Sequence, residues 1–352
     1  MRSGWPSTEV SCIDIHAHGV PESFVQEVAR TTLAGVSVAV DGRSYRLTFP
    51  GGKELRPVTG VMMQFADRAP WLDLQDVSTQ FVAPWLDVHG QQLPAADGRT
   101  WVRLLNDAVA DEVGASAGRL KAYATLHLAD PEAAARELAR ACQQLGFVGC
   151  MLPTNFPGGC LDEAKFDVLW EAASSLGVPV VLHPPTVAPS GPAFDRYPAL
   201  RTLARAVDTT VTAAAMLTSG VLHRFPHLRV VLVHGGGYLP YQVGRLDQGF
   251  PDGMPAAGGA TPSDVLRQFY FDSTALRPEA LAMLVRFAGA DHVMVGSDYA
   301  ATSEQSPWPE HSLLSNLRDI DDRDTGLVLT GTAVRLFGDT VTADGTAGPR
   351  PR

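Results

Sequence analysis

The chain has 352 residues, of which 45% are hydrophobic and 19% are charged, and its formal net charge is −10 at pH 7. This balance is that of a globular protein that buries its own core, and the negative charge argues against a nucleic-acid or anionic-membrane partner. No segment reaches the roughly 18–20 apolar residues of a membrane span, and the first residues lack the apolar run of a secretion signal. We therefore expect a cytoplasmic protein.

Short apolar segments alternate with amphipathic ones along the chain, a rhythm typical of βα units. In chain order, the predicted strands are Cys12–His18, Val77–Trp85, Leu120–Leu128, Phe147–Thr154, Pro179–Pro185, Arg229–Gly235, Phe269–Ala275 and Val293–Tyr299. Several are continuous apolar runs, as expected for parallel strands that are covered on both faces. The pattern predicts an α/β fold, a (β/α)₈ barrel of the TIM type.

Helices are predicted between these strands. Asp130-Pro131-Glu132 is a helix start, and the helix is expected to end near Leu145, before Gly146. Further helices are predicted over residues 163–176, 209–223, 278–288 and 321–337.

Two segments depart from the βα rhythm. Residues 34–58 are rich in glycine and β-forming residues, which predicts a small antiparallel β insertion after the first βα unit. Residues 299–312 form a loop rich in serine and proline beyond the last strand. Residues 1–338 are expected to be one domain, and the small, polar tail 339–352 is expected to be disordered.

Polar residues that can bind a metal stand at the carboxyl ends of several predicted strands. They are His16 and His18, His183, His234, Asp272 and Asp298. In a barrel these ends form the rim that carries the active site, and residues i and i+2 of one strand point the same way. Three neutral imidazoles and one carboxylate suit a divalent ion such as zinc and leave a position for water. Histidines in loops, such as His89 and His227, are expected to be solvated.

An esterase is a competing interpretation. His234-Gly235-Gly236-Gly237 resembles an oxyanion segment, and Gly114-Ala115-Ser116-Ala117-Gly118 matches the GxSxG pattern of a nucleophile elbow. An elbow should follow a strand and lie downstream of the oxyanion segment, whereas this one precedes it and follows a helix. We therefore interpret residues 114–118 as a helix stop and a loop.

Taken together, the motifs resemble the amidohydrolase superfamily, in particular the aminocarboxymuconate-semialdehyde decarboxylase branch. The matching segments are Ile13-Asp14-Ile15-His16-Ala17-His18, Asp41-Gly42 with Tyr45-Arg46, Leu182-His183-Pro184, Phe225-Pro226, His234-Gly235-Gly236-Gly237, Val243-Gly244-Arg245, Phe269-Tyr270 with Asp272, and Gly296-Ser297-Asp298-Tyr299. They extend from about residue 12 to residue 338 in the family's order.

The resemblance implies a role for each matching residue. The implied metal ligands are His16, His18, His183 and Asp298. His234 would be the catalytic acid/base, and Asp298 could also receive a proton. Arg46 and Arg245 would bind the substrate carboxylate, the latter in the site of the partner subunit of a homodimer.

Some residues depart from the family pattern. Ala300 follows Tyr299 where the family often has proline, Pro185 replaces an aromatic residue, and His127 replaces an apolar one. These changes put the substrate in doubt, and they leave the roles of His127 and Asp272 open. The fourth predicted strand carries no lysine to bridge two metals, so we expect one divalent ion, zinc in the first place and manganese as the alternative.

The expected reaction is non-oxidative decarboxylation of an unsaturated or aromatic carboxylic acid, with a metal-bound water and His234 as acid/base. The same site could instead catalyse hydrolysis, or hydration of an alkene, of a small carboxylated substrate. A catalytically silent barrel or binding module is a third possibility, and the complete set of metal-competent residues argues against it.

Overall fold

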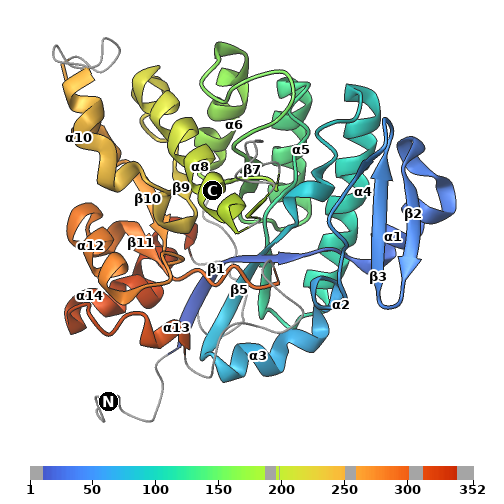
Figure 1. Ribbon diagram of the computed structural model, residues 1–352, viewed down its shortest axis with the longest axis horizontal. Coiled ribbons are helices and arrows are strands. Elements are labelled where there is room, and N and C mark those ends of the chain that lie inside the picture. The colour runs from blue at the N-terminus through green and yellow to red at the C-terminus, as the bar shows by residue number, and fades with distance from the viewer. Residues whose placement is uncertain (1–10, 187–195, 198, 250–258, 301–311, 339–352) are drawn as a thin grey trace.

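The structure is a computed structural model that describes residues 11–186, 196–197, 199–249, 259–300 and 312–338 (Figure 1). It contains all the predicted strands, as β1 (Cys12–Gly19), β5 (Val77–Pro84), β6 (Leu120–Ala122), β7 (Cys150–Pro153), β8 (Val180–His183), β9 (Val230–Leu232), β10 (Phe269–Asp272) and β11 (Val293–Met294). Apart from β1, most are shorter than predicted. The strands β8 and β10 still end at His183 and Asp272, whereas the chain leaves the ladder before His234 and Asp298. His234, for example, begins a 3₁₀ turn, His234–Gly236, instead of ending β9.

These strands form two parallel sheets, with the orders β1-β5-β6 and β11-β10-β9-β8-β7. Single parallel bridges connect the sheets at both sides, Ala17 with Tyr299 and Ala124 with Cys150. Backbone hydrogen bonds accompany them, from Ile15 to Val295 at 2.9 Å and from Met151 to Ala124 at 3.1 Å. The expected α/β class with parallel strands is confirmed.

Side chains of the parallel strands alternate between two separate hydrophobic clusters. One cluster lies between strands and helices, and it contains Val180, Leu182, Val230 and Leu232 among many others. The other is smaller, and it contains Ile13, Ile15, Phe81, Tyr123, Met151, Val181, Val231 and Met294 together with Leu336 and Phe337. Alternation of this kind is expected when one face of a parallel sheet meets helices and the other faces an enclosed interior.

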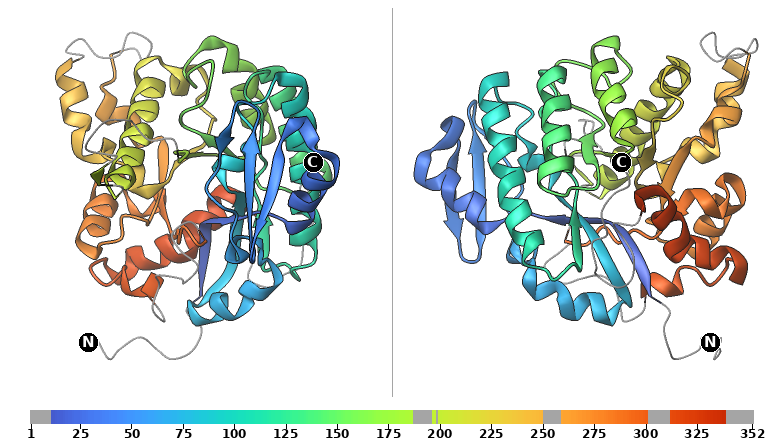
Figure 2. Two further views of the ribbon diagram at one scale, coloured as in Figure 1. Left: turned by 45° about the vertical axis from the view of Figure 1, so that its right-hand side comes forward. Right: turned by 180° about the vertical axis from the view of Figure 1, so that it is seen from behind.

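The helices α4 (Ala95–Gly114), α5 (Pro131–Gln144) and α6 (Asp167–Leu176) stand side by side outside the strands (Figure 2). The predicted start of α5 is confirmed, because the Asp130 carboxylate accepts a hydrogen bond from the Ala133 amide at 3.0 Å. After α4, the chain turns through Ala117 and Gly118, both with positive φ, and enters β6. Residues 114–118 are thus a helix stop and a turn, which removes the structural basis of the esterase interpretation.

A separate antiparallel sheet follows α1 (Glu22–Thr31) and contains β2 (Ser37–Asp41), β3 (Ser44–Phe49) and β4 (Lys53–Glu54). This sheet lies at the side of the molecule far from β10 and β11 (Figure 1). Its place in the sequence is that of the predicted β segment, residues 34–58.

Other predicted helices differ in extent. The helix α12 (Pro278–Ala288) has the predicted bounds, whereas α8 (Leu200–Thr218) begins before the predicted 209. The single helix predicted over 321–337 is α14 (Asp322–Gly326), a π-helical turn Leu327–Gly331 and α15 (Thr332–Phe337). The remaining helices are α2 (Gly60–Met63), α3 (Ala69–Leu74), α9 (Val221–Arg224), α10 (Leu239–Gly249), α11 (Pro262–Leu266) and α13 (Ser312–Ser315).

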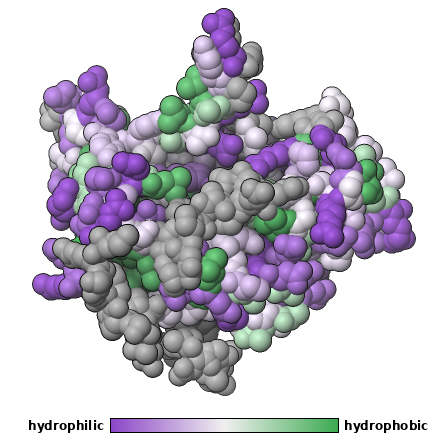
Figure 3. Space-filling view, turned by 60° about the horizontal axis from the view of Figure 1, so that its bottom comes forward, coloured by the Kyte–Doolittle hydropathy of each residue, from purple (hydrophilic) through white to green (hydrophobic). Residues whose placement is uncertain are grey.

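None of the helices within the described ranges has the length and apolar character needed to span a bilayer. The face shown in Figure 3 is largely hydrophilic and carries only small, separate hydrophobic patches. Residues 301–311 of the predicted serine-proline loop and the predicted tail, 339–352, lie outside the described residues.

Candidate metal centre

The predicted histidine pair of β1 lies at the carboxyl end of a strand whose residues are all buried. The Nε2 atoms of His16 and His18 lie 3.3 and 3.1 Å from Oδ1 of Asp298. Both imidazoles therefore point to the same carboxylate oxygen, as the i, i+2 spacing predicts.

His183, at the end of β8, and Asp298, in the loop after β11, complete the cluster. The Nε2 atoms of His183 and His18 are 3.2 Å apart, and the four potential ligand atoms all lie within 4.8 Å of one another. Asp298 is in the left-handed backbone region, with φ 55°, which is uncommon for a residue other than glycine. Strain at this residue indicates that the surrounding structure holds the carboxylate in place.

The cluster fits a divalent metal ion. His16 Nε2 and Asp298 Oδ1 are buried and have no hydrogen-bond partner, and two imidazole nitrogens face each other at 3.2 Å. Donor atoms bound to one ion at about 2.0–2.2 Å lie about 3.0–3.5 Å apart, and the His16–Asp298, His18–Asp298 and His18–His183 pairs have such separations. A cation would satisfy lone pairs that the protein leaves without donors.

Burial and charge set the protonation of the ligands. Burial lowers the pKa of the His183 imidazole well below its ordinary value, which keeps the ring neutral and able to bind a metal. Burial alone would raise the pKa of Asp298, but the charge of His16 and the close contacts with His18 and His234 outweigh it and hold this pKa well below its usual range. For His16, burial is outweighed by Asp298 and Asp272, which raise its pKa to about 10. A metal ion would displace that proton.

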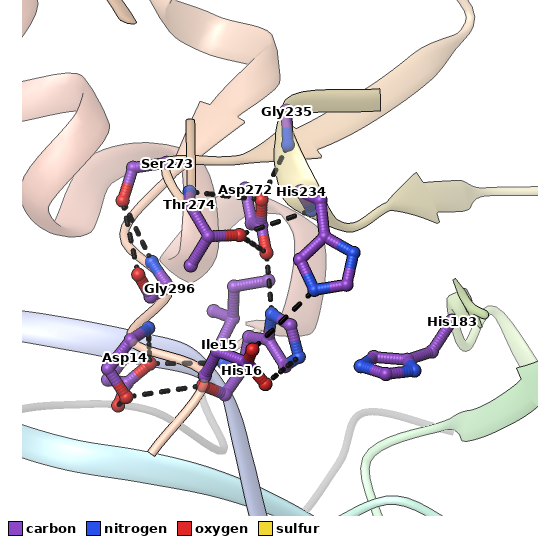
Figure 4. Close-up of polar contacts among 12 residues, drawn as sticks. Asp14, Ile15, His16, His183, His234, Gly235, Asp272, Ser273, Thr274 and Gly296 are labelled. Atoms are coloured by element: carbon purple, nitrogen blue, oxygen red, sulfur yellow. Dashed lines mark hydrogen bonds and ion pairs between the residues drawn. The ribbon is translucent and has the colours of Figure 1, made fainter. Parts of the chain in front are cut away.

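Asp272, whose role the sequence left open, orients His16. Its Oδ2 lies 2.6 Å from Nδ1 of His16 and accepts the Thr274 hydroxyl at 2.6 Å (Figure 4). Its Oδ1 accepts the Gly235 amide at 2.9 Å and the Thr274 amide at 3.1 Å. Such a carboxylate fixes the tautomer of a metal-binding histidine, so that Nε2 of His16 presents its lone pair to the ion.

A second buried network connects β1 to the loop that carries Asp298. The Asp14 carboxylate accepts the Ser297 hydroxyl at 2.6 Å and the Gln80 amide at 2.7 Å. Gln80 in turn accepts from Arg68 at 2.8 Å, and Arg68 also donates to the His18 carbonyl oxygen at 3.2 Å. These bonds fix the backbone on both sides of the metal cluster.

His234 lies beside the cluster, not inside it. Its Nε2 is 3.6 Å from Oδ2 of Asp298, and its side chain is 21% exposed, whereas the side chains of His16 and His18 are fully buried. The ring points towards His16 and His183 (Figure 4). Its φ of 56° is strained, and its amide donates to the Thr274 hydroxyl at 3.1 Å. A partly exposed imidazole beside a metal site can exchange protons with a bound substrate.

The two predicted substrate arginines lie on β3 and α10, not at the strand ends that carry the cluster. Arg46 is on β3, is 40% exposed and forms an ion pair with Asp41 at 3.5 Å. Arg245 is on α10 and is exposed.

Two other histidines have no place in the cluster. His127 is buried, and it packs on Gly98, where a Cβ atom would collide with the imidazole ring. His89 is buried too, contrary to expectation, because its Nε2 bonds to the Pro84 carbonyl oxygen at 3.1 Å. Burial lowers the pKa of His89 to about 3.

The structure adds residues that the sequence analysis missed. The ring of Trp85, at the end of β5, lies 4.9 Å from that of His18, and the Arg56 guanidinium lies over Trp85 at 5.3 Å. Arg56 follows Arg46 in the same segment, and the family motif in the sequence points to Arg46 alone. The packing on Trp85 brings Arg56, rather than Arg46, to the side of the cluster beside Trp85 and His18, which we call its mouth.

A model of the amidohydrolase family matches residues 13–338. The chain belongs to the amidohydrolase family. This amidohydrolase is 25% identical over 338 residues to 2-amino-3-carboxymuconate-6-semialdehyde decarboxylase of Dictyostelium discoideum, with 93% of this chain and 91% of the relative covered. It is 30% identical over 256 residues to gamma-resorcylate decarboxylase of a Polaromonas species, with 67% and 75% covered. The predicted resemblance is confirmed.

Solved structures agree on the fold. The 5-carboxyvanillate decarboxylase of Sphingomonas paucimobilis matches with a TM-score of 0.75 at 22% identity, covering 94% of this chain and 99% of that one. A Polaromonas dihydroxybenzoic acid decarboxylase with bound manganese and the inhibitor 2-nitroresorcinol matches with a TM-score of 0.74 at 22% identity, covering 94% and 97%. These relatives and neighbours are named as decarboxylases of carboxylic acids.

Proposed function

We propose that this amidohydrolase is a metal-dependent, non-oxidative decarboxylase of an unsaturated or aromatic carboxylic acid. The observation that carries the proposal is the cluster of His16, His18, His183 and Asp298, with His234 beside Asp298 at 3.6 Å. The family and the decarboxylases among its relatives support the same reaction.

We propose one divalent ion, held by these four residues. The three imidazoles and one carboxylate favour zinc, whereas the manganese of the Polaromonas structure supports manganese as the alternative. When bound, the ion would supply Lewis-acid polarisation of the substrate's oxygen atoms.

The protein's own residues supply the proton and the orientation. In this proposal His234 delivers a proton to the carbon that carries the carboxylate, and the carbon–carboxylate bond then breaks to release carbon dioxide. The imidazole then regains a proton from solvent, to which its side chain is 21% exposed, and Asp298 Oδ2, 3.6 Å from Nε2 of His234, can orient the ring. The cost of holding Asp298 and His234 in strained conformations is consistent with their positioning for this transfer.

We propose Arg56 as the substrate arginine within the subunit, in place of Arg46. The Arg56 side chain is half-buried and packs on Trp85, which itself contacts His18. Arg46, by contrast, has a carboxylate neighbour in Asp41 on its own sheet. A guanidinium at the mouth can grip a carboxylate with two parallel hydrogen bonds.

We keep the proposal of a homodimer in which Arg245 serves the partner's site. Exposed apolar side chains adjoin Arg245, and we call them the α8–α10 face. Leu203, Val207 and Val211 lie at helical spacing on α8. Tyr238 directly precedes α10, and Tyr241 lies in its first turn. The Tyr238 amide donates to the Thr210 hydroxyl at 2.7 Å, which holds the two helices together. An apolar face of this kind fits an interface between copies.

We propose further that the two parallel sheets are one closed eight-stranded barrel and that the β2–β4 sheet is an insertion in it. The bridges from Ala17 to Tyr299 and from Ala124 to Cys150 support closure, as does the separate cluster in the interior. One domain over residues 1–338 and a cytoplasmic location stay predictions.

The proposal is tested by incubating purified protein, loaded with zinc or with manganese, with a panel of carboxylated phenols and unsaturated diacids. Decarboxylation predicts carbon dioxide and a product shorter by one carboxyl group. A product of hydrolysis or hydration, formed without carbon dioxide, would instead establish the alternative reaction on the same residues.

A further inference from the structure

The helix α8 places Arg205 close to the mouth of the metal centre. Its next turns are fixed to the strand ends, because the Thr212 hydroxyl donates to the Thr154 carbonyl oxygen at 2.9 Å, directly after β7. On its other side, α8 meets the turn after His234, since Gly237 packs so closely on the Ala206 carbonyl that a Cβ atom would collide with it. Arg205 therefore belongs to the same rim as the proposed catalytic histidine.

Arg205 and Arg56 are two cations without a carboxylate partner among the described residues. Arg205 is half-buried, and its Nε is fully buried without a hydrogen-bond acceptor. The nearest acid in sequence, Asp208, bonds instead to Asn155, and its second carboxylate oxygen is also without a partner. Burying an unsatisfied guanidinium nitrogen costs free energy, which a bound anion would offset.

The charge of Arg205 is one of those that act on the pKa of Arg56. Burial lowers the pKa of Arg56, the charge of Arg205 lowers it further, and Asp87 and Asp298 act in the opposite direction. Asp87 lies outside ion-pair distance of Arg56, and its Oδ1 already accepts the Thr186 amide at 3.1 Å. Arg56 and Arg205 are thus close enough for the charge of one to act on the other beside the metal centre.

We propose that Arg205 and Arg56 form one anion site at this mouth, which binds a second carboxylate of the substrate. The inference rests on the proposed function and narrows its substrate class to dicarboxylic acids. The carboxylate that leaves lies at the metal centre, and the one that stays is gripped by the two guanidinium groups. Arg205 is thus a residue that determines specificity, and acids with a single carboxylate would be weak ligands.

The test measures binding of isophthalate and of benzoate to the metal-loaded protein by calorimetry, so that no turnover is needed. Wild type should bind isophthalate about 10-fold or more tightly than benzoate, the usual value of one charge-assisted hydrogen-bonded contact. Arg205→Ala should lose this ratio and leave benzoate binding unchanged. Arg205→Gln carries the same test if the alanine variant fails to fold.

Two variants serve as controls. Arg201→Ala removes an exposed arginine one turn earlier on α8 and should keep the ratio. Arg245→Ala tests whether Arg245, instead of Arg205, produces the preference for isophthalate over benzoate. The inference is overturned if wild type shows no preference, if Arg205→Ala keeps it, or if only Arg245→Ala loses it.

The rate of carbon dioxide release separates this inference from the proposed function. If decarboxylation occurs, Arg205→Ala should raise KM for a diacid by about 10-fold, with kcat nearly unchanged for a monoacid. An Arg205-dependent ratio in a protein that decarboxylates none of the panel would support the anion site and contradict the decarboxylase. If the protein decarboxylates an acid of the panel but Arg205→Ala keeps the binding ratio, the decarboxylase is supported and the anion site is contradicted.

Discussion

The metal centre and the mouth above it are built in opposite ways. At the centre, buried side chains hold one another, as Asp272 does by bonding at once to His16, Gly235 and Thr274. At the mouth, Arg56 and Arg205 are half-buried and have no acidic partner among the described residues. The metal-binding residues are therefore preorganised within the subunit, whereas the two arginines have no counterion until a ligand binds.

The largest effect is expected where the centre itself is broken. His183→Ala removes a neutral, buried imidazole from the cluster, so the protein should lose its metal and all measurable carbon dioxide release. Elemental analysis after purification checks this. The control is His227→Ala, which removes an exposed histidine and should keep both. Full metal content in His183→Ala would remove this residue from the ligand set.

Next in size is the loss of the proton donor beside the centre. His234→Ala should lower kcat by roughly 10²–10⁴-fold, the usual contribution of acid/base catalysis, while most of the metal stays bound. His292→Ala, at a distant half-exposed histidine, is the matched control. If the metal leaves together with the activity, His234 is a ligand and not the acid/base.

The next prediction concerns Arg245, which is proposed to reach the substrate of the partner subunit across the dimer interface. Arg245→Ala should weaken acid binding by roughly 2–5 kcal/mol if the ion pair is buried in the dimer. Mixed with His234→Ala protein and allowed to exchange subunits, it should recover activity towards about a quarter of wild type, since half of the dimers then hold one intact site. Exchange without recovery would mean that Arg245 serves its own chain or no substrate at all.

A smaller effect is expected from the carboxylate that supports the centre. Asp272→Asn keeps the shape but weakens the bond to Nδ1 of His16, so metal affinity should fall by roughly 10–100-fold in a chelator competition assay. Asp291→Asn, at a surface carboxylate, should leave it unchanged. Equal affinities in the two variants would show that Asp272 serves packing alone.

The smallest effect separates Arg46 from Arg56, two of the arginines in residues 34–58. Arg46→Ala removes an exposed ion pair and should change substrate binding by less than ~1 kcal/mol. Arg56→Ala should raise KM by about 10-fold or more, because a charge-assisted contact is lost. Steady-state kinetics on one acid compare both variants, and the reverse order would restore Arg46 to the substrate site.

The sequence predicted the metal centre better than the mouth, and the reason is physical. Strand ends in a barrel meet at one rim, so His16, His183 and Asp298 could be brought together from strand positions alone. The position of Arg56 depends on how the segment after β4 packs on Trp85, and no local pattern carries that information. Family motifs suggested Arg46 because it follows a tyrosine in a matching segment.

The same distinction applies to the fold. Apolar runs and capping residues predicted every parallel strand and the start of α5, because these signals are local. The early start of α8 and the π-helical turn Leu327–Gly331 are set by tertiary packing, which periodicity does not encode. His89 was expected to be solvated from its loop position, but the chain around it folds inward and buries it.

The most direct test of the account is a titration of metal-free protein with zinc and, separately, with manganese. Metal content and the rate of carbon dioxide release from an acid that the protein decarboxylates are measured on the same samples. The account predicts that the rate rises linearly and stops at one equivalent of metal per chain, the number that three histidines and one aspartate can hold. A rate that needs two equivalents, or one that is unchanged by metal, would contradict it.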